Sequence, residues 1–120
     1  MTLLHFSSGR PAGGAQGQAT FEMANLRPQK TGLPFVVFVS QRDDAQHDVR
    51  VKVSHGPKVF AHQMSTYGVR PFSFVAGQRL LTKEERLLED WIKKNEQTLI
   101  DYWNGDIEYT EEMLDKIVPV

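Results

Sequence analysis

Three histidines are the residues of this 120-residue chain best suited to bind a metal ion. His47, His55 and His62 fall in or beside neighbouring predicted strands, with Asp48 close by, and imidazole and carboxylate groups are zinc ligands. Their spacing matches no compact ligand motif such as His-Glu-x-x-His. His47 and His55 would also lie about 26 Å apart on one fully extended strand, at about 3.3 Å per residue. We therefore predict no metal site, and we interpret His47 as a strand-start residue and His55, before Gly56-Pro57, as a turn residue.

Four basic residues have the chemistry to contact phosphate groups. Arg50 and Lys52 project from the same face of one predicted strand, and Arg42 and Lys58 are close to them in sequence. Cations of this kind position a protein on a nucleic-acid backbone. Single-stranded nucleic acid also needs aromatic side chains on which its bases stack, and most phenylalanines here are needed for the core. Two interpretations stay open: a nucleic-acid contact made by these four residues, or a solvated sheet face.

The acidic residues do not indicate a catalytic site. Glu85, Glu89 and Lys93 follow one another at helical i,i+4 spacing, and acids in the first half of a helix interact favourably with its dipole. These effects explain them without catalysis. No serine lies in a nucleophile elbow, and no glycine-rich loop between a strand and a helix carries the Lys-Ser/Thr of a phosphate-binding loop. We predict no catalytic residue and no cofactor, and we favour a binding protein over an enzyme.

A long amphipathic helix over residues 82–104 must organise the fold. Thr82 and Glu85 have the spacing of a capping box, and Gly105 can adopt the left-handed conformation that ends a helix. Between them, residues spaced by three and four positions form one stripe: Leu88, Trp91, Ile92, Asn95, Leu99, Tyr102 and Trp103. Asn95 is the only polar residue of that stripe. It either forms a hydrogen bond inside the fold or fixes the register of an interface.

Strands are predicted before this helix. Residues 35–40 are apolar on both faces, which predicts a buried strand, and residues 47–54 alternate as in a half-exposed antiparallel strand. Residues 58–62 predict a short third strand. Residues 65–68 are typical of a turn. Residues 69–75 predict a fourth strand, with Phe72 and Phe74 on one face; Pro71 places it at an edge or a bulge. Residues 26–34 contain two prolines and a glycine and are poorly suited to regular structure.

The order of strands followed by helices predicts an α+β domain over residues 23–120. We expect a small, mostly antiparallel sheet packed against one long helix, with a short C-terminal helix that begins near Thr110 and ends before Pro119. Residues 1–22 are rich in Gly, Ser and Gln and predict a disordered tail. Met23 is either an alternative translation start or an ordinary residue at the end of that extension.

The composition and the lengths of the apolar segments exclude several classes of protein. Cysteine is absent, which excludes disulfides and thiolate metal sites. The longest apolar run, residues 33–39, is far below the roughly 20 residues that cross a bilayer. The first residues have too few apolar side chains for a signal peptide, and their only early cation, Arg10, follows them. We expect a cytoplasmic protein without a membrane partner.

Charge is unevenly distributed along the chain. Residues 82–120 carry five cations against eleven acids, whereas residues 1–81 carry nine cations against four acids. One interpretation is an acidic helical half beside a basic strand half, with the charges solvated or locally paired. The other is a basic sheet face that meets nucleic acid or an acidic partner.

Residues 35–104 resemble a group of small uncharacterised bacterial proteins. The similar features are the His-Asp-Val-Arg-Val-Lys-Val segment that begins at His47, the Leu-Thr-Lys-Glu-Glu segment at Leu81, and the Leu-Ile-Asp-Tyr-Trp segment at Leu99. In that group a short His-containing sheet segment precedes a helix with a Leu-x-x-x-Trp pattern. The His-x-His pattern of the group is absent here. Some members lie beside genes of toxin–antitoxin type, and no activity or functional residue carries over.

These observations favour a small protein-interaction module. Its partner is expected to be another protein, as in a toxin–antitoxin-like pair, or a second copy of the chain. The alternative is a nucleic-acid-binding protein that uses the strand face around Arg50 and Lys52.

Overall fold

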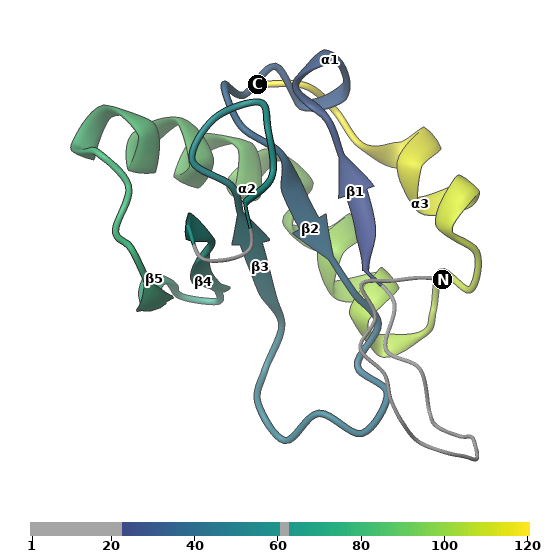
Figure 1. Ribbon diagram of the computed structural model, residues 1–120. Helices are drawn as coiled ribbons and strands as arrows, with labels where there is room; N and C mark the ends of the chain where they lie inside the picture. Colours follow the sequence, from purple (N-terminus) through teal and green to yellow (C-terminus); the bar gives the residue numbers. More distant parts are fainter. Residues whose placement is uncertain (1–22, 61–62) are drawn as a thin grey trace.

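A computed structural model describes residues 23–60 and 63–120 of the chain. Figure 1 shows an α+β fold in which a five-stranded sheet lies in front of one long helix. The elements in chain order are β1 (Ala24–Leu26), α1 (Pro28–Thr31), β2 (Val37–Val39), β3 (Arg50–Val53), β4 (Ser65–Val69), β5 (Phe72–Gly77), α2 (Thr82–Asn104) and α3 (Thr110–Lys116). The predicted fold class is confirmed. The tail predicted for residues 1–22 lies outside the described residues.

The sheet is a meander in which each strand pairs antiparallel with the next. Its strand order is β1-β2-β3-β4-β5, so every neighbour in space is also a neighbour in sequence. Register places Asn25 opposite Phe38, Phe38 opposite Lys52, and Lys52 opposite Thr66. Since directly paired residues share a face, these four form one row across the side of the sheet that faces away from the core.

Helix α2 covers the other face, and its stripe is buried as predicted. All seven stripe residues are buried: Leu88, Trp91, Ile92, Asn95, Leu99, Tyr102 and Trp103. Gly105 ends the helix with φ of 85°, which also confirms the prediction. The stripe meets the inward side chains of the strands, among them Val37, Val51, Val53 and Tyr67. The apolar residues of the sheet and the tryptophans of the helix therefore form one core.

The alternation in β3 is confirmed. Val51 and Val53 are buried, Lys52 is exposed and Arg50 is half-buried. The apolar segment 35–40 is buried along its whole length, although only Val37–Val39 forms the strand β2.

Two predictions between residues 58 and 75 are wrong, and the strand predicted over residues 69–75 is displaced, because Val69 is the last residue of β4. Residues 65–68, predicted as a turn, lie in β4, and the turn is instead at Arg70 and Pro71, so that β5 begins only at Phe72. Proline at the turn is reasonable because it has no N–H to give to a ladder. Residues 58–60 are not a strand, and residues 61–62 lie outside the described residues.

Regular structure also occurs in residues 26–34, contrary to the prediction. Leu26 ends β1, and Pro28 is the first residue of α1, where its missing N–H costs nothing. Gly32 ends α1 with φ of 79° and donates its N–H to the Pro28 carbonyl oxygen. The proline and the glycine that predict a break are therefore the first residue and the C-cap of a single helical turn.

The start of α2 differs by one residue from the predicted capping box. The residue before the helix is Leu81, and its N–H donates to Oε1 of Glu84 over 3.1 Å. Glu84 therefore takes the role predicted for Glu85, because the helix begins one residue earlier than the Thr82 cap required. Glu85 is thereby free to face the sheet.

The C-terminal part packs where it was predicted. Helix α3 begins at Thr110, and Met113 and Ile117 are buried while Leu114 is partly buried. Beyond it the chain runs back to α1, where the N–H of Val120 donates to the Thr31 carbonyl oxygen over 2.8 Å. None of the helices described here is both long enough and apolar enough to span a bilayer.

Gly77, at the end of β5, has a backbone that only glycine fits. Its φ is 90°, and a Cβ atom at this position would collide with the carbonyl oxygen of Met64. The last residue of β5 therefore lies unusually close to the start of β4.

Candidate functional site

The four predicted basic residues do not converge on one site. Arg50 and Lys52 lie two residues apart in β3 and share the helix-free face of the sheet. Arg42 lies in the loop before β3, where its main-chain N–H donates to the Trp103 carbonyl oxygen, and Lys58 lies in the loop after β3. The structure therefore pairs Arg50 with Lys52 and separates Arg42 from Lys58 by the length of the strand.

The helix-free face is nevertheless basic. Across all five strands the only charged residues are Arg50 and Lys52. The ion pairs found in residues 23–60 and 63–120 use other cations: Arg70 with Asp48, Arg79 with Glu85, and Lys93 with Glu89. The two strand cations are thus available to an acidic ligand.

The two described histidines have separate partners. The ring of His47 stacks on Trp103 with 5.3 Å between centroids, and its Nδ1 lies 2.7 Å from the Asp48 carbonyl oxygen. His55 lies beyond the other end of β3 and contacts Ser65. Within the described ranges there is no group of three or more His, Cys, Asp or Glu residues with metal-binding geometry. His62, the third histidine considered, lies outside those ranges.

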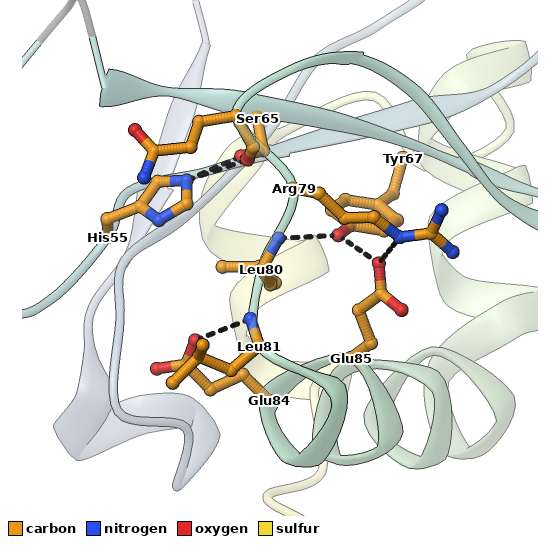
Figure 2. Close-up of polar contacts among 9 residues, drawn as sticks. His55, Ser65, Tyr67, Arg79, Leu80, Leu81, Glu84 and Glu85 are labelled. Atoms are coloured by element: carbon orange, nitrogen blue, oxygen red, sulfur yellow. Dashed lines mark hydrogen bonds and ion pairs between the residues drawn. The ribbon is translucent and has the colours of Figure 1, made fainter.

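A Ser–His pair is present that the residue pattern did not predict. Nε2 of His55 lies 2.6 Å from Oγ of Ser65 (Figure 2). It also lies 2.9 Å from the Gln78 carbonyl oxygen, to which the Ser65 hydroxyl donates. Ser65 is fully buried, so its hydroxyl is closed to solvent. These contacts hold the backbone at Gln78 beside the start of β4 and the ring of His55.

A second polar cluster lies beside it at the start of α2. The hydroxyl of Tyr67 donates to Oε2 of Glu85 over 2.6 Å and accepts the Leu80 N–H over 3.0 Å, while Nε of Arg79 donates to the same Oε2 over 2.8 Å. Figure 2 shows Tyr67, Arg79 and Glu85 directed at one another. The guanidinium of Arg79 also lies 5.5 Å from the ring centroid of Phe74.

The pKa values of this cluster follow from its contacts. Burial first, and then the hydrogen bond to Glu85, raise the pKa of Tyr67 to about 12. Burial alone would raise the pKa of Glu85, but the hydrogen bonds from Tyr67 and Arg79 outweigh it and lower that pKa. At neutral pH the tyrosine is therefore protonated and the glutamate charged. The Tyr67 hydroxyl, Oε2 of Glu85 and Nε of Arg79 are all bonded within the fold, so the cluster joins β4 to α2.

The residue pattern does not reveal this cluster, for a definable reason. It places Tyr67 in a turn and Glu85 in the helix cap. Only the pairing of β4 with β3 and β5 brings Tyr67 beneath the helix, across 18 positions in the chain. The available signal was the position of Glu85 three residues before Leu88, which places this acid on the same helix face as the buried stripe.

The outer edge of β5 is the second surface of interest. β5 pairs with β4 on one side, and no described strand pairs with it on the other. Its sequence, Phe-Ser-Phe-Val-Ala-Gly, has no charged residue. The strand contains a bulge opposite Thr66 and Tyr67, and four of its six residues are exposed.

Comparison with known proteins supplies no relative. No protein-family model, no curated protein and no solved structure matches this chain significantly.

Proposed function

We propose that the protein is an interaction module that binds another polypeptide, and that the partner adds a strand to the free edge of β5. The observation that carries the proposal is an uncharged edge strand of six residues. Edge strands expose a row of main-chain N–H and C=O groups, and proteins usually protect them with lysine, proline, β-bulges or very short length. Within β5 the one such device is the bulge between Phe74 and Ala76. The opposite edge, β1, has only three residues and is followed by Arg27 and Pro28.

The residues around β5 suit an uncharged partner. Arg70 and Arg79 flank the strand, and each is already paired, with Asp48 and Glu85 respectively. A partner strand therefore needs no acid to neutralise them. Exposed apolar side chains occur in the strand and in the segment that follows it: Val75 in β5, Leu81 before α2 and Leu87 in α2 are 40 %, 63 % and 38 % exposed. Main-chain pairing at the edge would provide affinity, and contacts with these side chains would provide selectivity.

The partner is another protein, as in a toxin–antitoxin-like pair of a bacterial cytoplasm, or a second copy of the chain. The resemblance of residues 35–104 to small bacterial proteins supports the first. An uncharged strand supports the second, since two copies of it bring no like charges together.

Selection from a random peptide library tests the proposal, because it requires no named partner. Random peptides displayed on phage would be selected on the full chain, and binding would be mapped by NMR through the amides of residues 72–77. Sedimentation velocity of the same protein would detect self-association. We expect Val75→Lys to weaken either association by at least about tenfold, because a charge at the edge opposes pairing. The matched control is Val118→Lys, which changes a similarly exposed valine in the C-terminal segment after α3.

Two results would reject this function: peptides that bind elsewhere on the chain, or no selected peptide together with a monomeric chain. Equal effects of Val75→Lys and Val118→Lys on association would show that the edge of β5 is not the binding site.

A second candidate function is nucleic-acid binding on the helix-free face. The specific observation in its favour is that Arg50 and Lys52 are the only charges in the strands and neither forms an ion pair with a described residue. Fluorescence anisotropy with labelled RNA and DNA, at about 50 mM and about 200 mM salt, tests it because phosphate contacts weaken steeply with salt. We expect no binding at physiological salt. Submicromolar binding that disappears in the Arg50→Glu/Lys52→Glu variant would make nucleic acid the leading candidate.

A further inference from the structure

A cavity of about 330 Å³ lies on the helix-free side of the sheet, at the end opposite β5. One wall is the corner between β1 and α1, and the other is the loop that follows β3, which Figure 1 shows curving over the sheet near α1. The lining residues are Asn25, Arg27, Pro28, Gln29, Val36, Pro57 and Val59. Ligand sites usually measure about 300–1,000 Å³, so this one suits a small ligand.

The wall formed by the β3–β4 loop is held in place by a buried serine. Oγ of Ser54 accepts the N–H of Val36 over 2.9 Å and donates to the Gly56 carbonyl oxygen over 2.7 Å. The N–H of Ser54 also donates to the Val36 carbonyl oxygen over 3.0 Å. These bonds hold residues 54–56, which precede Pro57, against Val36 in the lining of the cavity. This wall is therefore ordered before a ligand binds, and binding does not bear the entropic cost of ordering it.

The other wall is held as firmly. The N–H groups of Lys30 and Thr31 both donate to the Arg27 carbonyl oxygen, over 2.8 and 3.1 Å. Oγ1 of Thr31 accepts the N–H of Leu33, and the Thr31 carbonyl oxygen accepts that of Val120. The backbone that carries Arg27 and Gln29 is therefore fixed from both sides.

The lining divides into a polar and an apolar part. Asn25, Arg27 and Gln29 offer hydrogen-bond donors, while the remaining four residues are two prolines and two valines. Residues 23–32 and 54–60, which build the walls, contain the cations Arg27, Lys30 and Lys58 and no acid. Arg27 forms no ion pair with a described residue. The site thus combines an available guanidinium with an apolar surface and a positive local charge.

We propose that this cavity is a binding site for a carboxylate attached to a small apolar group. The planar guanidinium of Arg27 matches a carboxylate through two parallel hydrogen bonds. The amides of Asn25 and Gln29 complete the polar half, and the apolar group rests on Val36, Pro57 and Val59. A phosphate ester fits less well, because a single arginine lines the cavity and four of the seven lining residues are apolar. The site lies at the other end of the sheet from β5 and does not depend on the function proposed for that edge.

Two sources can supply this chemistry: a free organic acid, or the C-terminal carboxylate of a polypeptide with an apolar last residue. NMR titration of the full chain distinguishes them. The probes are benzoate, isovalerate, a short peptide ending in valine with a free carboxylate, and the same peptide with an amidated end. We expect saturable shifts at the amides of Val36, Lys58 and Val59 with the carboxylates and none with the amidated peptide. The source that binds more tightly identifies the class of ligand.

A variant pair tests the role of Arg27. Arg27→Gln should weaken carboxylate binding by at least about tenfold, since hydrogen bonds to a charged group are the strong ones. Lys30→Gln removes the same charge from a cation that does not line the cavity, and it should change affinity by less than about twofold. Arg27 is exposed, so its variant should fold, which the unperturbed remainder of the spectrum would verify.

The proposal is overturned if no probe gives a saturable shift up to about 10 mM, a limit just above the range of weak specific binding. It is equally overturned if the amidated peptide binds as well as the acid, or if Arg27→Gln and Lys30→Gln have the same effect.

Discussion

The side-chain amide of Asn95 forms a pair of hydrogen bonds with the main chain of Val118. Nδ2 donates to the Val118 carbonyl oxygen over 2.9 Å, and Oδ1 accepts the Val118 N–H over 2.7 Å. Nδ2 also donates to the Trp91 carbonyl oxygen over 2.9 Å. The one polar residue of the α2 stripe thus binds the C-terminal segment, as the neighbouring strand of a sheet would. Of the two interpretations open for Asn95, hydrogen bonding inside the fold is the one observed.

Replacing this amide should loosen the C-terminal segment. Asn95→Ala leaves the N–H and C=O groups of Val118 without their partner, and we expect a loss of about 1–3 kcal/mol in the free energy of unfolding. Urea denaturation would measure it, and hydrogen exchange should show faster exchange at Val118. The control is Gln97→Ala, which removes an exposed hydrogen bond to Asp101. Similar losses in both variants would contradict the assignment.

Tyr67 should contribute to stability through its hydroxyl group. Tyr67→Phe removes the acceptor of the Leu80 N–H and the donor to Glu85 while keeping the ring, so we expect a cost of about 1–3 kcal/mol. Tyr109 is 64 % exposed, and Tyr109→Phe should cost less than about 0.5 kcal/mol. Thermal or chemical unfolding distinguishes the two, and an unaffected Tyr67→Phe variant would mean that water replaces the lost bonds.

Acid should destabilise the protein partly through Glu85. Its pKa is lowered in the folded state relative to a reference of 4.5, so the stabilisation is present above that reference and is lost as the pH falls through the folded pKa. Glu85→Gln should therefore flatten the pH dependence of the unfolding free energy below about pH 5.

Asp48→Asn is the comparison for that experiment. The hydrogen bond with Arg70 lowers the pKa of Asp48 too, but both side chains are largely exposed, so the pair contributes less. A larger effect at Asp48 than at Glu85 would show that the Tyr67 cluster is weaker than its geometry indicates.

Trp91 should be the most costly residue of the stripe to truncate. It is fully buried, and Trp91→Ala should cost about 3–5 kcal/mol, whereas Lys94→Ala on the exposed side should stay within about 0.5 kcal/mol. Its indole N–H has no hydrogen-bond partner among the described residues. Trp91→Phe should therefore cost clearly less than Trp91→Ala, because only volume is lost. Equal costs for the two Trp91 variants would contradict a cost that scales with the volume removed from the core.

The sequence predicts α2 and α3 well because their signal is local, whereas the single turn α1 was not predicted. The spacing of Leu88, Trp91 and Leu99 lies within one segment, and that spacing defines the buried stripe whatever packs against it. The predictions for β4 and β5 are displaced because strand formation depends on the neighbouring strand. Ser65 to Gly68 has the composition of a turn, but pairing with β3 makes it a strand.

The same distinction applies to the candidate sites. Arg50 and Lys52 share a face because they are two residues apart, which a sequence predicts directly. The positions of Arg42 and Lys58 depend on the conformations of loops, which residue patterns do not predict. The cavity brings Asn25 close to Val59, and residue patterns do not predict that contact either. The contact between Tyr67 and Glu85 similarly requires the completed sheet.

Exposed residues usually tolerate substitution, but Gly77 should not, because its backbone lies so close to Met64. Gly77 lies on the surface, where most replacements are accepted, yet any side chain there meets backbone that cannot move aside. It is also paired with Ser65, and Gln78 follows it directly, so displacing it would draw the Gln78 carbonyl away from Ser65 and His55. In a scan of all single substitutions, position 77 should stand out as an exposed site with the intolerance of a core residue, and it would mark this fold in distant relatives whose other surface residues have changed.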